Sequence, residues 1–169
     1  IAAVVWPQAF GTLLYLAEFN LNSQTAGQLT SDLTQAIEEY LKNQISSNNL
    51  EQTLEKLLIE LNPILQNHER LFGNPLAPRY HLCLAFLNGQ ELALSTLGHL
   101  SALVINEEHI TNITKENTPH RPTNKPCFQN IISGNINSNE TLMLASPTLF
   151  DYVSTNKLLS IINTSAPGV

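Results

Sequence analysis

The chain has 169 residues, of which 43% are hydrophobic and 13% charged, with a formal net charge of −6. A chain of this length forms one domain that buries roughly 70% of the surface its unfolded form exposes. We therefore expect a single domain over residues 1–169. Only eight residues are Lys or Arg, which argues against a nucleic-acid-binding protein, because such proteins need clustered positive charge. The longest apolar runs, Ile1–Trp6 and Leu82–Leu87, are far shorter than the roughly 20 residues that span a membrane.

The N-terminal end shows no pattern typical of a targeting signal. The sequence begins at Ile1 rather than Met, with no cationic segment before an apolar one, so we expect a piece of a longer polypeptide. We place it in the cytoplasm. Cys83 and Cys127 allow one disulfide, but two thiols are interpreted more simply as a buried small hydrophobe and a loop residue.

The first half of the chain predicts one strand and two helices. Gly11–Phe19 is rich in strand formers and ends in a polar turn, which is typical of a mostly buried strand. A helix follows, because apolar residues recur every fourth position and would face a core: Leu29, Leu33, Ile37, Leu41 and Ile45. The pattern from Leu50 to Leu65 predicts a second helix with Asn49 as its N-cap. Pro63 should kink or break that helix.

The middle of the chain predicts an antiparallel meander. Gly73–Arg79 is a loop by its Gly, Asn and Pro content. The strands expected after it are Tyr80–Leu87, Glu91–Leu97, Leu100–Ile105 and a shorter run near His109–Ile113. Asn88-Gly89 lies between the first two, and this dipeptide is the strongest short signal for a hairpin with a type I′ turn.

The last third predicts a basic loop, two strands and two short helices. Lys115–Cys127 contains three of the eight basic residues and three prolines, so we expect an exposed loop. Strands are expected on both sides of the polar turn Asn135–Asn139, and helices in Ser146–Val153 and Ser154–Ile162. Helices and antiparallel strands segregated along the chain indicate an α+β domain, with helices covering one face of each sheet.

No motif in the sequence identifies a catalytic centre by itself. The five histidines show none of the pair spacings used by zinc sites. Ser146-Pro147 is typical of a helix start, since Ser is a preferred N-cap and Pro suits the first helical position. Asp32 and Asp151 are the only aspartates, whereas Mg²⁺ and Mn²⁺ need several oxygen ligands.

Three segments nevertheless resemble the protein phosphatase 2C family of metal-dependent Ser/Thr phosphatases. "LLYLAEFNLNSQTAGQLTSDL" is similar to its first signature, with Ala26-Gly27 matching and Glu18 near the position of an Asp-Gly pair. "ELALSTLGHLSALVI" is similar to a strand, Gly-Asp-Ser, strand element, with Gly98 in place and His99 at the position of the Asp. "SGNINSNETLMLASPTLFDYVSTNKLLSII" resembles a strand, Ser-Asp-Gly-Leu, helix element, with Ser146 kept and Pro147 at the position of the metal-binding Asp.

The resemblance implies a four-layer αββα sandwich with a metal cleft between two antiparallel sheets, here without the family's closing C-terminal elements. It also implies a degenerate site, because Glu18, His99 and Pro147 stand where the family's catalytic carboxylates are expected. Our first hypothesis is a pseudophosphatase without a cofactor, a binding or regulatory module that has a protein partner and belongs to a longer bacterial chain.

Two other hypotheses remain. One is an active metal-dependent phosphatase in which Glu18 and His99 bind a single altered metal, with Mn²⁺ or Mg²⁺ as cofactor. The other is an N-terminal nucleophile hydrolase, which shares an αββα sandwich but needs Thr, Ser or Cys at the mature N-terminus. Ile1 argues against this last hypothesis if it is the real start.

Overall fold

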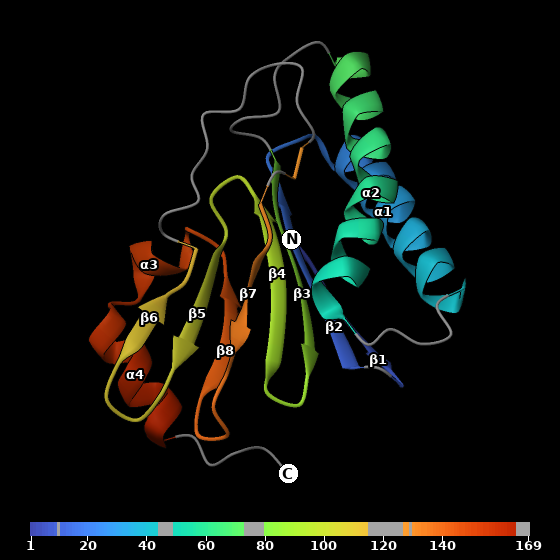
Figure 1. Cartoon of the computed structure of the whole chain (residues 1–169). Coiled ribbons are helices and arrows are strands. Elements are labelled where there is room, and N and C mark those ends of the chain that lie inside the picture. The colour runs from blue at the N-terminus through green and yellow to red at the C-terminus, as the bar shows by residue number, and fades with distance from the viewer. Residues whose placement is uncertain (10, 44–48, 73–79, 115–126, 129, 165–169) are drawn as a thin grey trace.

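The architecture consists of two antiparallel sheets with a helical layer outside each of them (Figure 1). It comes from a computed structural model, which describes residues 1–9, 11–43, 49–72, 80–114, 127–128 and 130–164. None of the helices in these ranges combines the length and the apolar character that a membrane span requires. The predicted loops Gly73–Arg79 and Lys115–Cys127 fall almost entirely outside the described residues.

The first helical layer contains α1 (Ser23–Asn43) and α2 (Leu50–Phe72). The Asn22 side chain accepts a hydrogen bond from the Thr25 N–H at 2.9 Å, so α1 begins at a capped N-terminus. The predicted apolar stripe of α1 is buried at Leu29, Leu33, Ile37 and Leu41, whereas Ile45 lies outside the described residues. Asn49 caps α2 as expected, since its side chain accepts from the Gln52 N–H at 3.0 Å.

Of the kink or break predicted at Pro63, the break does not occur, because α2 does not end there. The helix continues to Phe72 with Pro63 inside it. Pro63 lies on the exposed side of the helix, where water can hydrogen-bond the carbonyl that loses its intrahelical donor. On the opposite side, the apolar stripe runs past the proline through buried Leu61 and Leu65, and this packing holds the second half of the helix in place.

The larger sheet, sheet A, has five strands in the order β1-β2-β3-β4-β7. Their bounds are Ala2–Gln8, Gly11–Phe19, Tyr80–Asn88, Glu91–Leu97 and Ile132–Asn135. In β2, alternate residues Leu13, Tyr15 and Ala17 are buried against the helices, and the residues between them face the other way. The sequence analysis missed β1, whose continuously apolar start hides its alternation.

The hairpin between β3 and β4 is confirmed, but its turn differs from the prediction. Asn88 pairs directly with Glu91, so the two loop residues are Gly89 and Gln90. No residue other than glycine has a positive φ among the described residues, and Gly89 has φ 58°. Positive φ at the first loop position alone, with Gly there, is the pattern of a type II′ turn. Asn88 therefore extends the strand, and the type I′ prediction is wrong.

The smaller sheet, sheet B, has three strands in the order β6-β5-β8. They are Ser101–Ile105 (β5), Ile110–Asn112 (β6) and Thr141–Ala145 (β8). Two helices follow β8, α3 (Leu149–Tyr152) and α4 (Thr155–Thr164). The prediction of one continuous meander is wrong, because β5 and β6 belong to sheet B and β3 and β4 to sheet A. The strands and helices themselves were predicted, with shorter bounds in the structure at most ends.

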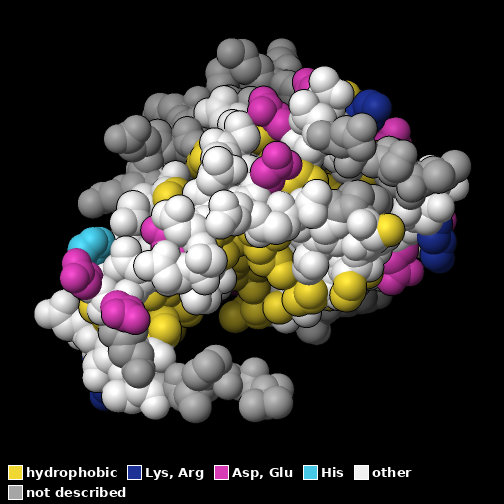
Figure 2. Space-filling view, turned by 60° about the horizontal axis from the view of Figure 1, so that its bottom comes forward, with side chains coloured by type: hydrophobic (Ala, Val, Ile, Leu, Met, Phe, Trp, Pro, Cys, Tyr) yellow, Lys and Arg dark blue, Asp and Glu magenta, His cyan; other side chains and the backbone are white. Residues whose placement is uncertain are grey.

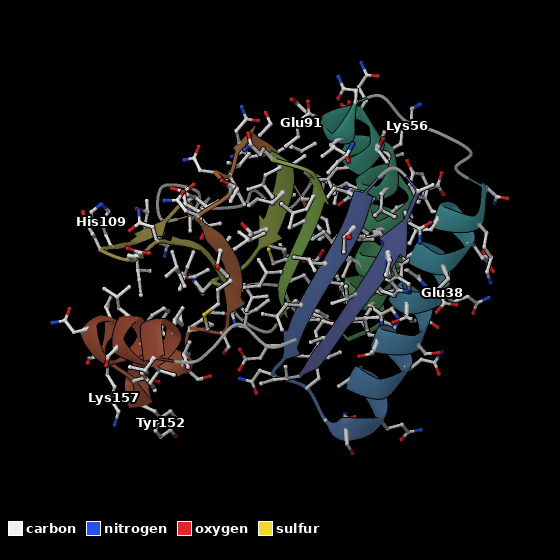
Figure 3. The ribbon with its side chains drawn as sticks, turned by 90° about the horizontal axis from the view of Figure 1, so that it is seen from below. Glu38, Lys56, Glu91, His109, Tyr152 and Lys157 are labelled. Atoms are coloured by element: carbon white, nitrogen blue, oxygen red, sulfur yellow. The ribbon has the colours of Figure 1, made fainter. Side chains whose placement is uncertain are left out.

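Three hydrophobic clusters lie between the four layers. The largest joins α1 and α2 to sheet A. A second, which includes Ala85, Leu94 and Ala102, lies between the sheets, and a third packs α4 onto sheet B through Leu158. Figure 3 shows Glu38 of α1 and Lys157 of α4 on opposite outer sides of the molecule. The expected αββα arrangement is therefore confirmed.

Candidate functional site

A cluster of polar side chains lies where β2 of sheet A and β8 of sheet B end. Glu18 is the next-to-last residue of β2, and Ser146 follows β8 directly. The Ser146 hydroxyl donates a hydrogen bond to a carboxylate oxygen of Glu18. Side chains alternate between the two faces of a strand, and those of Leu13 and Ala17 face the helices. Glu18, which follows Ala17, therefore faces the gap between the sheets. Alternation along one strand thus places the carboxylate between the two layers.

The segment from Ser146 to Thr148 forms a turn before α3. The Thr148 N–H lies 3.3 Å from the Ser146 Oγ, and the hydroxyls of the two residues lie 2.7 Å apart. The predicted helix start at Ser146-Pro147 needs correction, because regular helix begins at Leu149 and the N-cap residue Thr148 makes no side-chain cap hydrogen bond. The Ser146 hydroxyl accepts a hydrogen bond from a backbone N–H as a cap does, but it also donates a hydrogen bond to Glu18.

One histidine lies next to Glu18, and a second histidine contacts the first. His81 is the direct partner of Glu18 in the β2–β3 ladder, so both side chains are on the same face of sheet A. The His99 N–H donates to Nδ1 of His81 at 3.1 Å, and the two rings are tilted by 44° with centroids 5.5 Å apart. Because Nδ1 of His81 is an acceptor, a neutral His81 carries its proton on Nε2.

Gly98 permits this histidine arrangement. It has φ 77°, and a Cβ added there would lie 2.4 Å from both Nδ1 of His81 and the carbonyl oxygen of Tyr80. Any other residue would collide with the β3 backbone as well as with the ring. The glycine of the segment that resembles the phosphatase element is therefore required by the close approach of the chain to β3.

The structure brings the sequence-derived site residues together. Glu18 bonds Ser146, Pro147 is adjacent to Ser146 in the chain, and His99 reaches the cluster through His81. The sequence analysis missed His81, because its nearness to Glu18 depends on the register between β2 and β3, which no local spacing reveals. We refer to Glu18, His81, His99, Ser146 and Thr148 as the inter-sheet polar cluster.

The inter-sheet polar cluster does not fit two hard cations. It contains one carboxylate, whereas Mg²⁺ and Mn²⁺ need several oxygen ligands. Across the described part of the chain, no three His, Cys, Asp or Glu side chains are close enough together to hold a metal ion. The cluster can exchange hydrogen bonds between hydroxyls, a carboxylate and imidazoles.

The remaining candidate residues, two aspartates and two cysteines, lie in surroundings that are typical of structural residues. The Oδ2 of Asp32 on α1 lies 3.0 Å from Nε2 of His68 on α2, which joins the two helices. Asp151 is exposed in the first turn of α3. Cys83 and Cys127 are both buried and form no disulfide with each other. Burial raises the pKa of the Cys83 thiol to about 12, which makes it unreactive at neutral pH.

Comparison with known proteins gives a consistent result for the fold only. No protein-family model and no curated protein matches the sequence. Among solved structures, a point mutant of a bacterial serine phosphatase superposes with a TM-score of 0.77 at 19% identity, covering 98% of this chain and 77% of the other. The serine/threonine phosphatase Stp1 from Staphylococcus aureus gives 0.71 at 18% identity, covering 98% and 77%.

The serine/threonine phosphatase PstP/Ppp from Mycobacterium tuberculosis is also similar, with a TM-score of 0.65 at 13% identity over 96% of this chain and 78% of the other. A further solved structure is the catalytic domain of PstP in complex with two manganese ions, with a TM-score of 0.67 at 15% identity. At these identities the likeness concerns the arrangement of strands and helices. The chain therefore has the fold of the bacterial serine/threonine phosphatases, which is the fold that its resemblance to the protein phosphatase 2C family implies.

Proposed function

We propose that the chain is a catalytically degenerate phosphatase-like domain, which works without a metal cofactor as a binding or regulatory module for a protein partner. The observation that carries the proposal is the hydrogen bond between Ser146 and Glu18. Glu18 is the only carboxylate at the three positions where the resemblance expects carboxylates, and it accepts a hydrogen bond from the Ser146 hydroxyl. His99 and Pro147 occupy the other two positions.

The chemistry of these residues supports a role other than two-metal hydrolysis. A two-metal site holds its ions about 4 Å apart with bridging and flanking carboxylates. Pro147 has no side-chain atom that could bind a metal. The Nδ1 atom of His81 already accepts a hydrogen bond from the backbone N–H of His99. A single carboxylate leaves two divalent cations without the ligand charge that would hold them.

A second candidate is a working phosphatase with one altered metal. The pairing of Glu18 with His81 in the β2–β3 ladder favours it, because imidazole and carboxylate together suit a transition metal. In that case the metal would share the Glu18 carboxylate with the Ser146 hydroxyl or displace that hydroxyl, because a carboxylate has two oxygens.

The experiment that separates the two candidates combines turnover with thermal stability. The purified protein is incubated with p-nitrophenyl phosphate and a phosphopeptide in Mn²⁺ or Mg²⁺, and its melting temperature is measured with and without each ion. A bound cation stabilises a protein by about 2.7 kcal/mol at one hundred times its Kd. We expect no phosphate release and no shift in melting temperature. Metal-dependent turnover that disappears in Glu18→Ala would establish the enzyme instead.

A further inference from the structure

The β3–β4 hairpin contains the only Asn-Gly pair of the sequence, Asn88-Gly89. Asn88 is the last residue of β3 and pairs with Glu91, which leaves Gly89 and Gln90 as the two loop residues. All four residues are exposed. The turn lies at the lower end of the molecule in Figure 1, on the side that Figure 2 turns toward the viewer. The Asn-Gly pair is therefore in contact with solvent.

Asparagine is a chemically labile residue, and glycine is the following residue that hinders its main reaction least. In that reaction the backbone nitrogen of the following residue attacks the side-chain amide carbon, Cγ. An N–Cγ bond forms, the Cγ–Nδ2 bond breaks, and the amide leaves as ammonia with the proton of the attacking nitrogen. Water then opens the succinimide ring at either carbonyl carbon, which gives aspartate or isoaspartate. Water is the only co-reactant.

The local structure leaves the attacking nitrogen accessible. In a two-residue hairpin the hydrogen bonds that close the turn join the flanking residues, which here are Asn88 and Glu91. The ladder therefore does not use the Gly89 N–H. Beyond its chain neighbours, no described atom lies within 4 Å of a Cβ placed on Gly89, so the space in which the ring would form is open on that side.

Other asparagines in the described part of the chain have less favourable surroundings. Asn112 precedes a β-branched isoleucine, and its amide donates a hydrogen bond to Oγ of Ser101 at 3.1 Å. Asn137 is exposed but precedes a serine, and its amide donates to Glu140 at 3.0 Å. These two residues are internal standards for the reactivity of Asn88.

The reaction would act on a hairpin end that is held from two sides. A Cβ added to Gly11 of β2 would lie 3.1 Å from the Cβ of Asn88, and the Ile136 N–H donates to the carbonyl of Gln90 at 2.7 Å. Isoaspartate lengthens the main chain by a methylene group, so the hairpin end would have to shift against these contacts. Aspartate places a carboxylate directly opposite Glu91, and like charges directly opposite each other are destabilising.

We propose that Asn88 is a site of spontaneous deamidation, and that its conversion to aspartate or isoaspartate weakens the end of the β3–β4 hairpin. The inference goes beyond the proposed function and does not depend on it, because the reaction needs only Asn88, Gly89 and water. Asn88 ends β3, whereas His81 of the inter-sheet polar cluster lies at the start of the strand. The reaction therefore takes place away from that cluster.

The first test incubates the whole protein in neutral and in mildly alkaline buffer and follows the asparagines by peptide mapping and mass spectrometry. We expect Asn88 to give both aspartate and isoaspartate several-fold faster than Asn137 or Asn112 changes. The rate should rise with pH, because the attacking nitrogen must lose its proton. A sample unfolded in urea gives the rate without the fold. Asn88→Gln is the matched control and should convert far more slowly, because its longer side chain closes a less favourable ring.

The second test measures the consequence for stability. Asn88→Asp has the aspartate product from the start, and we expect its melting temperature to be lower by about 1–4 °C. The loss should be smaller when Asn88→Asp is introduced together with Glu91→Gln, compared with Glu91→Gln alone, since the opposing charge is then absent.

Two results would overturn the assignment of the site: retention of the Asn88 amide in the folded protein, whether or not the unfolded sample converts, or conversion no faster than that of Asn137. An unchanged melting temperature in Asn88→Asp, or an equal loss with and without Glu91→Gln, would overturn the weakening of the hairpin. Metal-dependent phosphate release would end the proposed function and leave both tests unchanged.

Discussion

Ser146 donates a hydrogen bond to Glu18 across a sequence separation of 128 residues. The bond connects the end of β2 in sheet A with the turn after β8 in sheet B, at the position where the resemblance places a metal centre. Its partners come from different layers, and this intramolecular hydrogen bond engages one oxygen of the only carboxylate in the cluster. The first expectation concerns the residue next to Ser146.

Pro147→Asp should not create a phosphatase. The substitution adds one carboxylate beside Ser146, but a two-metal site needs several that converge on both ions. We expect no phosphate release from p-nitrophenyl phosphate in Mn²⁺ or Mg²⁺, measured beside a known phosphatase as positive control. Turnover in this variant would mean that a single added ligand is enough, which would contradict our account of the cluster.

Leu33→Ala should destabilise the fold by about 2–5 kcal/mol. Leu33 is fully buried in the cluster that joins α1 and α2 to sheet A, so the shorter side chain leaves a cavity. Urea unfolding measures the free energy. Leu71→Ala is the control, since Leu71 is 68% exposed and its loss should change stability by less than about 0.5 kcal/mol. Equal effects of the two changes would place the core elsewhere.

Gly98→Ala should destabilise the protein by at least about 2 kcal/mol, because a non-glycine residue at positive φ costs about 1–3 kcal/mol before any collision. Its Cβ would also meet the Tyr80 carbonyl and the His81 ring. Gly27→Ala is the opposite case, in a helix with open space around the new Cβ. That change should stabilise by about 0.5–1 kcal/mol. Thermal unfolding of the pair tests both signs.

Asn62→Ala should loosen the contact between α2 and the segment that precedes β7. The Asn62 Oδ1 accepts from the N–H groups of Cys127 at 2.6 Å and Phe128 at 3.1 Å. Losing the acceptor for these donors costs about 1–3 kcal/mol. Asn62→Asp keeps an oxygen acceptor and should lose less. Denaturant unfolding ranks the three proteins, and a ranking with Asp below Ala would show that the acceptor is unimportant.

Cys83 should resist alkylation in the native protein at pH 8. Burial raises the pKa of its thiol from 9.0 to about 12, so the reactive thiolate is scarce as well as inaccessible. Because the pKa is raised on folding, the associated stability is complete below pH 9 and is lost as pH rises towards 12. Iodoacetamide labelling with peptide mapping measures the alkylation of Cys83. Rapid native labelling of Cys83 would contradict its place in the core.

Where local pattern and tertiary packing agree, the sequence predicts the fold well. The β2 strand and the stripe from Leu29 to Leu41 follow directly from periodicity. Pro63 shows the limit of a local rule, because apolar contacts on one side of α2 outweigh a lost hydrogen bond on the solvent side. The turn at Gly89 shows another limit, since the register of β3 and β4 decides which residues form the loop.

The candidate site was predictable only in part, for a geometric reason. Glu18, Ser146 and His99 emerge from segments that resemble known elements, but the role of His81 depends on its pairing with Glu18 in the β2–β3 ladder. Residues 20–79 lie between the two strands, so no spacing along the chain signals their contact.

The three hydrophobic clusters differ greatly in size, and this inequality has a consequence for folding cooperativity. The cluster beneath α1 and α2 contains most of the large buried side chains, while those on either side of sheet B are small. Regions with few buried apolar contacts open at lower free-energy cost than the rest of a protein. Sheet B with α3 and α4 is therefore the part that detaches first. Ser146 would leave with it, and Glu18 would remain on a scaffold that stays folded.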